Sequence, residues 1–231
     1  MSEEEKHLDK VRRSFDAAED YDEKMSRTCP SHQPLLDAIM RCAKVAAGPA
    51  RILELGVGTG LLAQELLRAF PKARLVAIDF SPNMIERATK RLSRLKARVE
   101  LVQGDFYEQA FPSGQALVVS SYAIHHLSDV QKATLFEKVY DCLAEDGVFI
   151  NGDCVVSRSD RLNELQNQCW LDAMHQREAS QQEIDQTIRD YYEYDIPATV
   201  DDQLGWLERA GFSEAECMWR NFGSAVIVAI K

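Results

Sequence analysis

The residues best suited to chemistry in this chain of 231 residues lie together between Ile52 and Gly60. They form an apolar run, a Gly-x-Gly-x-Gly turn and the start of an apolar-periodic segment. Glycine suits such a turn because a Cβ would block both a sharp bend of the backbone and the close approach of a ligand. The helix expected to begin near Thr59 adds unpaired N–H groups at its positive end. The stretch therefore predicts a binding site for a nucleotide-type cofactor.

Three further segments have the pattern of strands, and each has polar side chains at its end. Asp79 ends the run from Arg74, about 20 residues past the glycines, where a carboxylate that binds ribose hydroxyls is expected. The run 99–106 contains a second acid near its end, and the run 116–121 ends in two serines. Open α/β sheets bind ligands at the carboxyl ends of their strands, so these groups are expected at one edge. A nicotinamide oxidoreductase is the alternative, although its Gly-x-Gly-x-x-Gly fingerprint places the third glycine one residue later.

At these residues the chain resembles the class I S-adenosylmethionine-dependent methyltransferases. Their signature is an acid-x-Gly-x-Gly-x-Gly stretch with an acid after the second strand and another after the third, matched here by Glu54–Gly60, Asp79 and Asp105. The resemblance covers about residues 15 to 231 and implies S-adenosyl-L-methionine as the cofactor. It implies that the glycine loop carries the methionine moiety and that Asp79 holds the ribose hydroxyls. It also implies that Phe80 and Met84 pack on the adenine and that Asp105 and Phe106 face its edge. The cofactor-binding residues that it implies are Tyr21, His32, Glu54, Gly56, Val57, Gly58, Gly60, Asp79, Phe80, Met84, Gly104, Asp105, Phe106, Ser120 and Ser121.

Three segments, 77–87, 210–212 and 221–224, also resemble the carboxy-S-adenosylmethionine synthases of tRNA wobble-uridine modification. That group grips the extra carboxylate of its cofactor through an arginine on the last helix, at a position that we match to Trp206. Its cofactor-covering tyrosine matches His32, and its strand-four asparagine matches Ser121. The resemblance implies a sister group that uses ordinary S-adenosylmethionine. A carboxy-S-adenosylmethionine synthase-like activity and a catalytically silent cofactor-binding module remain alternatives.

The expected fold is a single α/β Rossmann-like methyltransferase domain with a seven-stranded, mostly parallel sheet, a C-terminal antiparallel hairpin and a helical lid. Residues 1–48 are expected to form a helical cap with a frayed start at 1–14, and 49–154 the cofactor-binding core. Residues 155–200 are an insertion that forms the lid, and 201–231 the last helix and hairpin. Ser81 and Pro82 have the pattern of a helix N-cap and first position. The other expected helices and the hairpin strands are Pro34–Ala47, Asp129–Leu143, Arg161–Gln176, Gln181–Glu193, Asp201–Ala210, Glu214–Arg220 and Ala225–Ile230.

Candidates for the acceptor site come from the insertion, the last helix and the strand-four exit. Methyl transfer is an in-line displacement that depends on positioning, and a base is needed only if the acceptor has a proton to lose. The candidate proton acceptors are His125, His126 and Asp153. The candidate acceptor-binding residues are Trp170, His175, Tyr191, Tyr194 and Trp206. Packing of the insertion on the sheet is the alternative role for these aromatic residues.

Composition limits the partners. Lys and Arg total 27 against 37 acids, a net charge of −10, which disfavours a nucleic-acid substrate and favours a small-molecule acceptor. The basic cluster at 90–98 has the pattern of a solvated helix face, with a local nucleic-acid patch as the alternative. The chain has no apolar run of about 18 residues and no signal-peptide pattern. Six scattered cysteines and five histidines predict reduced thiols, no metal site and a cytoplasmic location.

Overall fold

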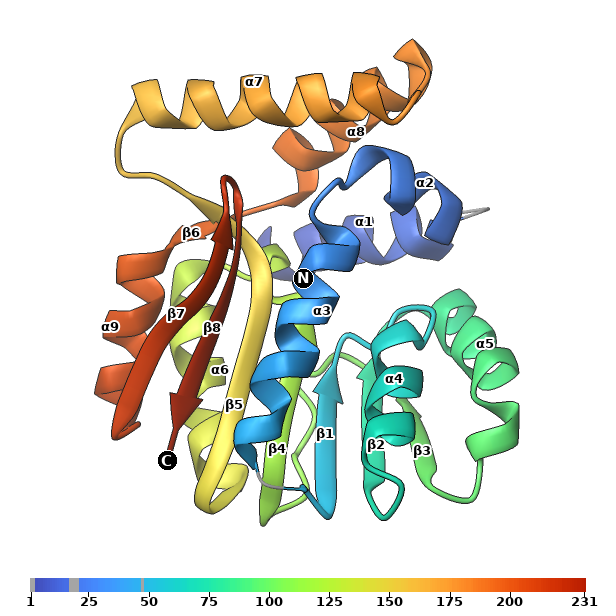
Figure 1. Ribbon diagram of the computed structural model, residues 1–231, viewed down its shortest axis with the longest axis vertical. Helices are drawn as coiled ribbons and strands as arrows, with labels where there is room; N and C mark the ends of the chain where they lie inside the picture. Colours follow the sequence, from blue (N-terminus) through green and yellow to red (C-terminus); the bar gives the residue numbers. More distant parts are fainter. Residues whose placement is uncertain (1–2, 17–20, 47) are drawn as a thin grey trace.

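The computed structural model describes residues 3–16, 21–46 and 48–231. A twisted sheet with helices on both faces forms the lower part of the molecule, and a layer of helices lies across one end of the sheet (Figure 1). That end is the carboxyl edge of the parallel strands. Any ligand bound at this edge therefore lies between the sheet and the helical layer.

The sheet has the order β3-β2-β1-β4-β5-β8-β7, and the short β6 pairs with the end of β5. Strands β1 to β5 run parallel, whereas β8 is antiparallel to both β5 and β7. This arrangement confirms the predicted mostly parallel sheet with its C-terminal antiparallel hairpin. The strand bounds are β1 Arg51–Leu55, β2 Arg74–Asp79, β3 Val99–Gln103, β4 Gln115–Ser121, β5 Leu143–Val156, β6 Ala198–Thr199, β7 Glu214–Asn221 and β8 Ser224–Ile230.

Helices cover the two sheet faces with separate hydrophobic clusters. One cluster joins α3, α4 and α5 to the sheet, and the other joins α6 and α9 to its opposite face. The predicted cap of α5 is confirmed, since the Ser81 side chain accepts a hydrogen bond from Met84 N and Pro82 opens the helix. The bounds of these helices are α3 His32–Cys42, α4 Leu61–Ala69, α5 Pro82–Arg91, α6 Asp129–Cys142 and α9 Val200–Ala210. Short 3-10 turns follow or connect them at η1 Ala43–Ala46, η2 Ser93–Leu95 and η3 Ile124–His126.

The layer over the carboxyl edge combines two segments of the sequence that lie outside the minimal sheet (Figure 1). It contains α1 and α2 from the N-terminal region and α7 and α8 from the insertion at 155–200. Their bounds are α1 Glu3–Asp16, α2 Tyr21–Thr28, α7 Asp160–Gln176 and α8 Gln181–Tyr194. The two insertion helices were predicted within one residue at each end.

The expectation that residues 1–14 are frayed is wrong for the described part of that segment. Helix α1 buries Val11, and Ser128 Oγ donates to Glu4 Oε1 at 2.8 Å. At its end, Ser81 Oγ donates to Asp16 Oδ1 at 2.7 Å. The many charges of α1 occupy its outer face while its other face packs on the molecule, so charge content alone misled the prediction. Residues 17–20 of the predicted helical cap, and residue 47 at the end of the helix expected to follow it, lie outside the described residues.

None of the helices within the described ranges has both the length and the apolar character needed to cross a membrane.

Candidate functional site

The glycine turn lies at the carboxyl end of β1 and opens a cavity beneath the helical layer. Gly56, Gly58 and Gly60 have φ values of +75°, +52° and +81°, a region that side chains other than glycine rarely adopt. A Cβ on Gly56 would lie 2.3 Å from the Cβ of Ala123, so this position also requires glycine for packing. The N–H groups of Gly56 and Val57 donate to Ile78 O at 2.9 and 3.0 Å, which fixes the turn against β2.

Two buried carboxyl groups face this cavity. Glu54 is 1% exposed, and its Oε2 has no hydrogen-bond partner. Burial, with a smaller contribution from Asp79, raises the pKa of Glu54 well above its ordinary value. Asp79 accepts hydrogen bonds from Gly58 N at 2.8 Å and Ser81 N at 3.0 Å, while burial raises its pKa to about 6. An unsatisfied buried carboxyl group signals a missing partner, and a ligand with an ammonium group and hydroxyls would supply it.

The roof of the cavity comes from the N-terminal helices. Asp22 on α2 binds Arg91 of α5 at 2.5 Å and accepts from Thr59 Oγ1 at 2.8 Å. The Phe15 ring lies 6.0 Å from Tyr21, between centroids, and 6.1 Å from Phe80. These contacts hold α1 and α2 over the glycine turn, so the two helices cover one side of the cavity.

Most of the residues predicted to bind the cofactor lie together around this cavity. Those that line it are Tyr21, His32, Glu54, Gly56, Val57, Gly58, Asp79, Phe80, Met84, Asp105, Phe106 and Ser121. No Lys or Arg within the described ranges belongs to this lining.

Three residues predicted for the same site are not part of the lining. Gly60 caps α4 and lies where a Cβ would come within 3.2 Å of the Ala88 backbone, so it serves helix packing. Gly104 donates its N–H to Asp79 O at 2.8 Å. Ser120 is fully buried and donates its hydroxyl to Leu55 O at 2.9 Å, so it holds β4 to β1. These positions support the lining from behind.

Several lining residues escaped the prediction, among them Phe15, Asp22 and Tyr122. Tyr122 follows Ser121 directly at the strand-four exit, and this position next to a predicted site residue could have marked it as part of the site. It has φ +49°, and its hydroxyl lies 3.0 Å from Ser224 Oγ. Nothing in the sequence pattern around Phe15 and Asp22 marks them as ligand-facing, because their position depends on how α1 and α2 pack.

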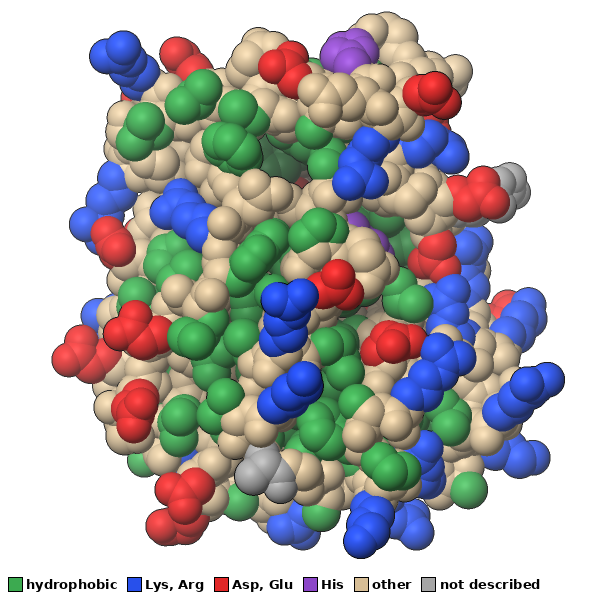
Figure 2. Space-filling model, in the orientation of Figure 1, with side chains coloured by type: hydrophobic (Ala, Val, Ile, Leu, Met, Phe, Trp, Pro, Cys, Tyr) green, Lys and Arg blue, Asp and Glu red, His purple; other side chains and the backbone are tan. Residues whose placement is uncertain are grey.

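A second cavity, which we call the inner chamber, adjoins the first and shares Phe15, Tyr21, Tyr122 and His126 with it. The predicted acceptor residues Trp170, Tyr191 and Tyr194 all line the inner chamber. A third cavity, the outer chamber, lies between α7 and the β7–β8 turn and shares Trp170 and Tyr191 with the inner one. Figure 2 shows a recess below the helical layer with hydrophobic side chains around it.

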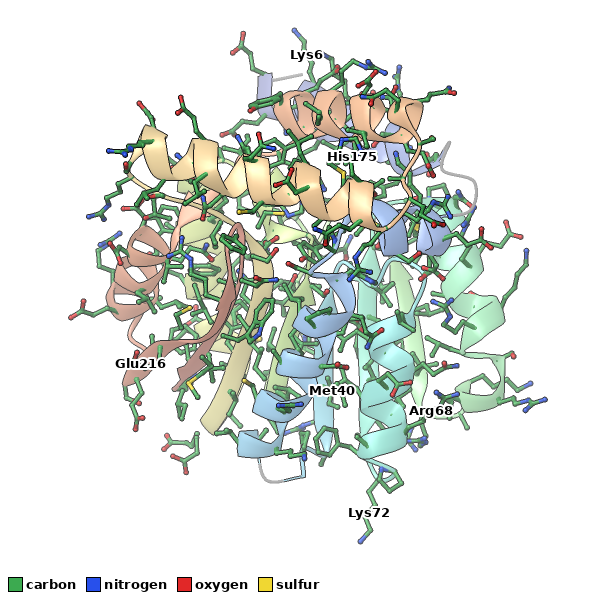
Figure 3. All side chains as sticks on the ribbon, turned by 45° about the horizontal axis from the view of Figure 1, so that its top comes forward. Lys6, Met40, Arg68, Lys72, His175 and Glu216 are labelled. Atoms are coloured by element: carbon green, nitrogen blue, oxygen red, sulfur yellow. The ribbon has the colours of Figure 1, made fainter. Side chains whose placement is uncertain are left out.

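The other two predicted acceptor residues lie elsewhere. His175 is exposed on α7 in the helical layer (Figure 3). Trp206 on α9 packs against Phe136 of α6, 6.3 Å between ring centroids, and has Lys132 Nζ 6.0 Å from its ring. Trp206 lines neither the cofactor cavity nor the two chambers. The structure therefore gives no support to Trp206 as the residue in place of a carboxylate-binding arginine.

His125 is a buried ion-pair partner. Its Nδ1 lies 2.5 Å from Asp153 Oδ1, and its Nε2 lies 3.4 Å from Asp195 Oδ1. Although burial opposes the charge, the two carboxylates raise the pKa of His125 to about 10. A histidine that keeps its proton at neutral pH cannot accept another, so the geometry argues against His125 as a base. Asp153 is engaged by this ring and by His125 N, which donates to its Oδ2 at 2.9 Å.

His126 has the opposite character. Burial and the neighbouring His125 charge lower its pKa to about 4, so its ring is neutral at neutral pH. Its Nδ1 lies 3.1 Å from Tyr194 O, which fixes the proton on that nitrogen. Its Nε2 is buried without a hydrogen-bond partner, and the residue belongs to the lining of both the cofactor cavity and the inner chamber. His126 therefore has an unpaired lone pair on a ring shared by the two cavities.

Two groups within the described ranges have donor atoms close enough to hold a metal ion: His125, His126 and Asp195, and His125, Asp153 and Cys154. Both depend on His125, whose two ring nitrogens already face carboxylates. A protonated imidazole cannot ligate a metal, so these contacts fit an ion pair better than a metal site.

The basic cluster at 90–98 lies around α5, on a side of the molecule where Lys and Arg side chains gather (Figure 2). Two of its members have structural roles. Arg91 pairs with Asp22, and Arg98 donates to Leu67 O at 2.9 Å.

Comparisons with known proteins agree with the fold. A family model described as a methyltransferase domain matches residues 52–147. Carboxy-S-adenosyl-L-methionine synthase of Nautilia profundicola is 28% identical over 214 residues, covering 91% of this chain and 90% of that protein.

Solved structures with the same fold are larger proteins. A putative O-methyltransferase of Nostoc punctiforme has a TM-score of 0.65 at 19% identity, and 87% of this chain matches 56% of that one. Human N-acetylserotonin methyltransferase in complex with SAM has a TM-score of 0.59 at 18% identity, with 87% and 51% of the two chains matched. The chain thus spans about half the length of these structural neighbours.

Proposed function

We propose that this chain, an S-adenosylmethionine-dependent methyltransferase with S-adenosylmethionine as its cofactor, methylates a small-molecule acceptor bound in the inner chamber. The observation that carries this proposal is the shared lining of the two cavities. Phe15, Tyr21, Tyr122 and His126 belong to both, so a ligand in one cavity lies beside a ligand in the other. Adjacent cavities with a shared lining are what a two-substrate transfer requires.

The cofactor cavity fits S-adenosylmethionine at three points. The unpaired Glu54 carboxyl would hold the ammonium of the methionine part, beside backbone at Gly56 and Gly58 that has no side chain to obstruct it. Asp79 would accept the ribose hydroxyls, and Phe80 and Met84 would pack on adenine. The bound cofactor supplies an electrophilic methyl group on a sulfonium.

The contribution of the protein is then mainly positional. Collinear approach of the acceptor atom to the methyl group requires both ligands to be held at fixed distances. The roof formed by Phe15 and Tyr21, tied to α5 by the Asp22–Arg91 pair, covers the junction of the two cavities. His126 Nε2 accepts a hydrogen bond from the acceptor and so orients the attacking atom.

A binding and turnover experiment tests this function. Calorimetric titration should show S-adenosylhomocysteine binding and no binding of NAD. A screen of small thiols, phenols, carboxylates and amines with S-adenosylmethionine should then release S-adenosylhomocysteine with at least one class. Cofactor binding without turnover of any acceptor would favour a catalytically silent binding module instead.

One observation favours a second function, that of a carboxy-S-adenosylmethionine synthase. The similarity to such proteins runs over 91% of this chain. Against it, a carboxylate on the sulfonium needs a cation, and the described lining of the cofactor cavity holds no Lys or Arg.

A further inference from the structure

The inner chamber is unusually aromatic for a cavity beside a cofactor site. Its described lining includes residues from α1, α2, the β4 exit and both insertion helices. The aromatic rings among them are Phe15, Tyr21, Tyr122, Trp170, Tyr191 and Tyr194. Trp170 and Tyr191 meet edge to face at 5.5 Å, and Trp170 Nε1 donates to Thr28 O at 2.8 Å. The rings are therefore held in place before any acceptor binds.

The charges around the inner chamber leave an excess of negative charge. Lys24 pairs with Asp190 at 3.5 Å, so that pair is balanced. His125 is a single cation between two carboxylates, Asp153 and Asp195. Of the described ionic groups that line the chamber, Lys24 and His125 balance Asp190 and Asp195, and Asp153 behind the lining adds one negative charge to the His125 cluster. Burial raises the pKa of the Cys154 thiol, which keeps that group neutral.

We propose that the acceptor is an amine whose nitrogen is attached to an aromatic or other apolar group. This proposal rests on the function proposed above. The nitrogen lone pair forms the new N–C bond while the C–S bond breaks and its electron pair returns to sulfur. The products are S-adenosylhomocysteine and a methylated ammonium, which then releases a proton to solvent if it still carries one. Positive charge therefore appears on nitrogen inside the chamber.

Aromatic faces and a nearby carboxylate excess stabilise such a charge. Cations lie favourably over the faces of Trp, Tyr and Phe, most of all where water is excluded. The net negative charge of the His125 cluster adds attraction across the chamber. A carboxylate acceptor would meet the same negative charge, and the one lysine of the chamber, Lys24, is already paired.

His126 also fits an amine better than a hydroxyl acceptor. An alcohol must lose its proton as it attacks, which needs a base matched to that task. With a pKa of about 4, His126 is a weak proton acceptor but a competent hydrogen-bond acceptor. An amine that has given its ammonium proton to solvent before it binds attacks with its N–H still attached and needs only to be oriented.

The outer chamber provides room for the body of the acceptor. It continues past Trp170 and Tyr191 and carries the side-chain amides of Asn163, Gln166 and Asn167. Phe222 and Tyr192 at its lining are 53% and 70% exposed, so apolar surface faces solvent there. These amides are uncharged, which suits a neutral polar tail.

Matched probes with one aromatic body test the inference by binding. Protein saturated with S-adenosylhomocysteine is titrated calorimetrically with 2-phenylethylamine, its N,N,N-trimethylammonium form, 2-phenylethanol and phenylacetate. We expect the two nitrogen probes to bind about tenfold more tightly than the alcohol, and phenylacetate most weakly. Equal or tighter binding of the alcohol or the carboxylate, or no binding of any probe, would overturn the amine assignment. S-adenosylhomocysteine binding and turnover of an oxygen or sulfur acceptor would in that case leave the methyltransferase function standing.

A pair of variants at Tyr191 distinguishes the contribution of the aromatic face to binding from the contribution of side-chain shape. Tyr191→Phe keeps the ring, whereas Tyr191→Leu removes the π face at similar bulk. The Leu variant should weaken binding of the trimethylammonium probe about fivefold while 2-phenylethanol changes little, and the Phe variant should behave as wild type. Equal losses for both probes in the Leu variant would indicate packing alone and contradict the proposal.

Discussion

Nε2 of His125 lies 3.4 Å from Oδ1 of Asp195, and this pair joins the sheet to the helical layer. His125 follows β4, whereas Asp195 directly follows α8. The backbone adds to the connection, since Ile196 N donates to His125 O at 2.8 Å. The histidine thus anchors the end of the insertion over the cofactor cavity.

Removing the Asp195 charge should loosen the insertion. We expect Asp195→Asn to lower the free energy of unfolding by about 1–3 kcal/mol, because a buried charged hydrogen bond is lost. Asp201→Asn is the control, since Asp201 pairs with Arg158 at 3.6 Å but is largely exposed and should cost little. Urea denaturation measures the free energy of unfolding of both variants. Equal losses would show that the His125–Asp195 pair stabilises the protein no more than an exposed ion pair does.

The same pair predicts a pH dependence. The folded pKa of His125, about 10, lies above the ordinary 6.5. Its stabilising contribution is therefore fully present below pH 6.5 and is lost as the pH rises through about 10. The stability difference between wild type and His125→Gln should shrink steadily from pH 6.5 to pH 10. A difference that stays constant across this range would mean that His125 is neutral in the folded protein.

Asp79 should determine cofactor affinity. Asp79→Ala removes an acceptor for charge-assisted hydrogen bonds to the ribose, so we expect a loss of about 1.5–3 kcal/mol in binding of S-adenosylhomocysteine. Ser120→Ala is the control at a residue outside the lining, and its affinity should stay close to wild type. Calorimetric titration with S-adenosylhomocysteine measures the affinity of wild type and both variants. Equal affinities for wild type and Asp79→Ala would contradict the ribose assignment.

The ligand carried by the purified protein should be ordinary S-adenosylmethionine or S-adenosylhomocysteine. The described lining of the cofactor cavity offers no Lys or Arg for an additional carboxylate. Mass spectrometry of the extracted ligand measures this directly. A predominance of the carboxylated cofactor would support the synthase activity and would require a cation that reaches the cavity from elsewhere.

Substitution of His126 or Tyr194 should affect turnover and spare the cofactor. His126→Ala removes the unpaired lone pair of a ring shared by the two cavities, and Tyr194→Ala removes part of the chamber wall. We expect a fall in kcat/KM of about tenfold or more, with S-adenosylhomocysteine affinity within about twofold of wild type. His175→Ala, at an exposed position, is the matched control for kinetics. Joint loss of thermal stability and cofactor binding would indicate that His126 and Tyr194 only pack the insertion.

Local chemistry made the cofactor half of the site predictable from sequence. The glycine turn, the acid that ends β2 and the cap at Ser81 each depend on neighbours within a few residues. Their backbone conformations follow from the absent Cβ of glycine and from the capping hydroxyl. The hairpin of β7 and β8 was likewise evident from its alternating strands and short turn.

Tertiary structure alone decided the charge state and the surroundings of the residues predicted for the acceptor site. His125 and His126 are adjacent in sequence, yet contact with Asp153 and Asp195 keeps the first charged while burial keeps the second neutral. Trp206 and Tyr191 are both aromatic residues on helices, and only one of them faces a chamber. Charge state and orientation depend on groups far away in the chain, because desolvation and ion pairing act through space. The sequence by itself determined the fold and the cofactor, and the packing of the helical layer determined the lining of the inner chamber.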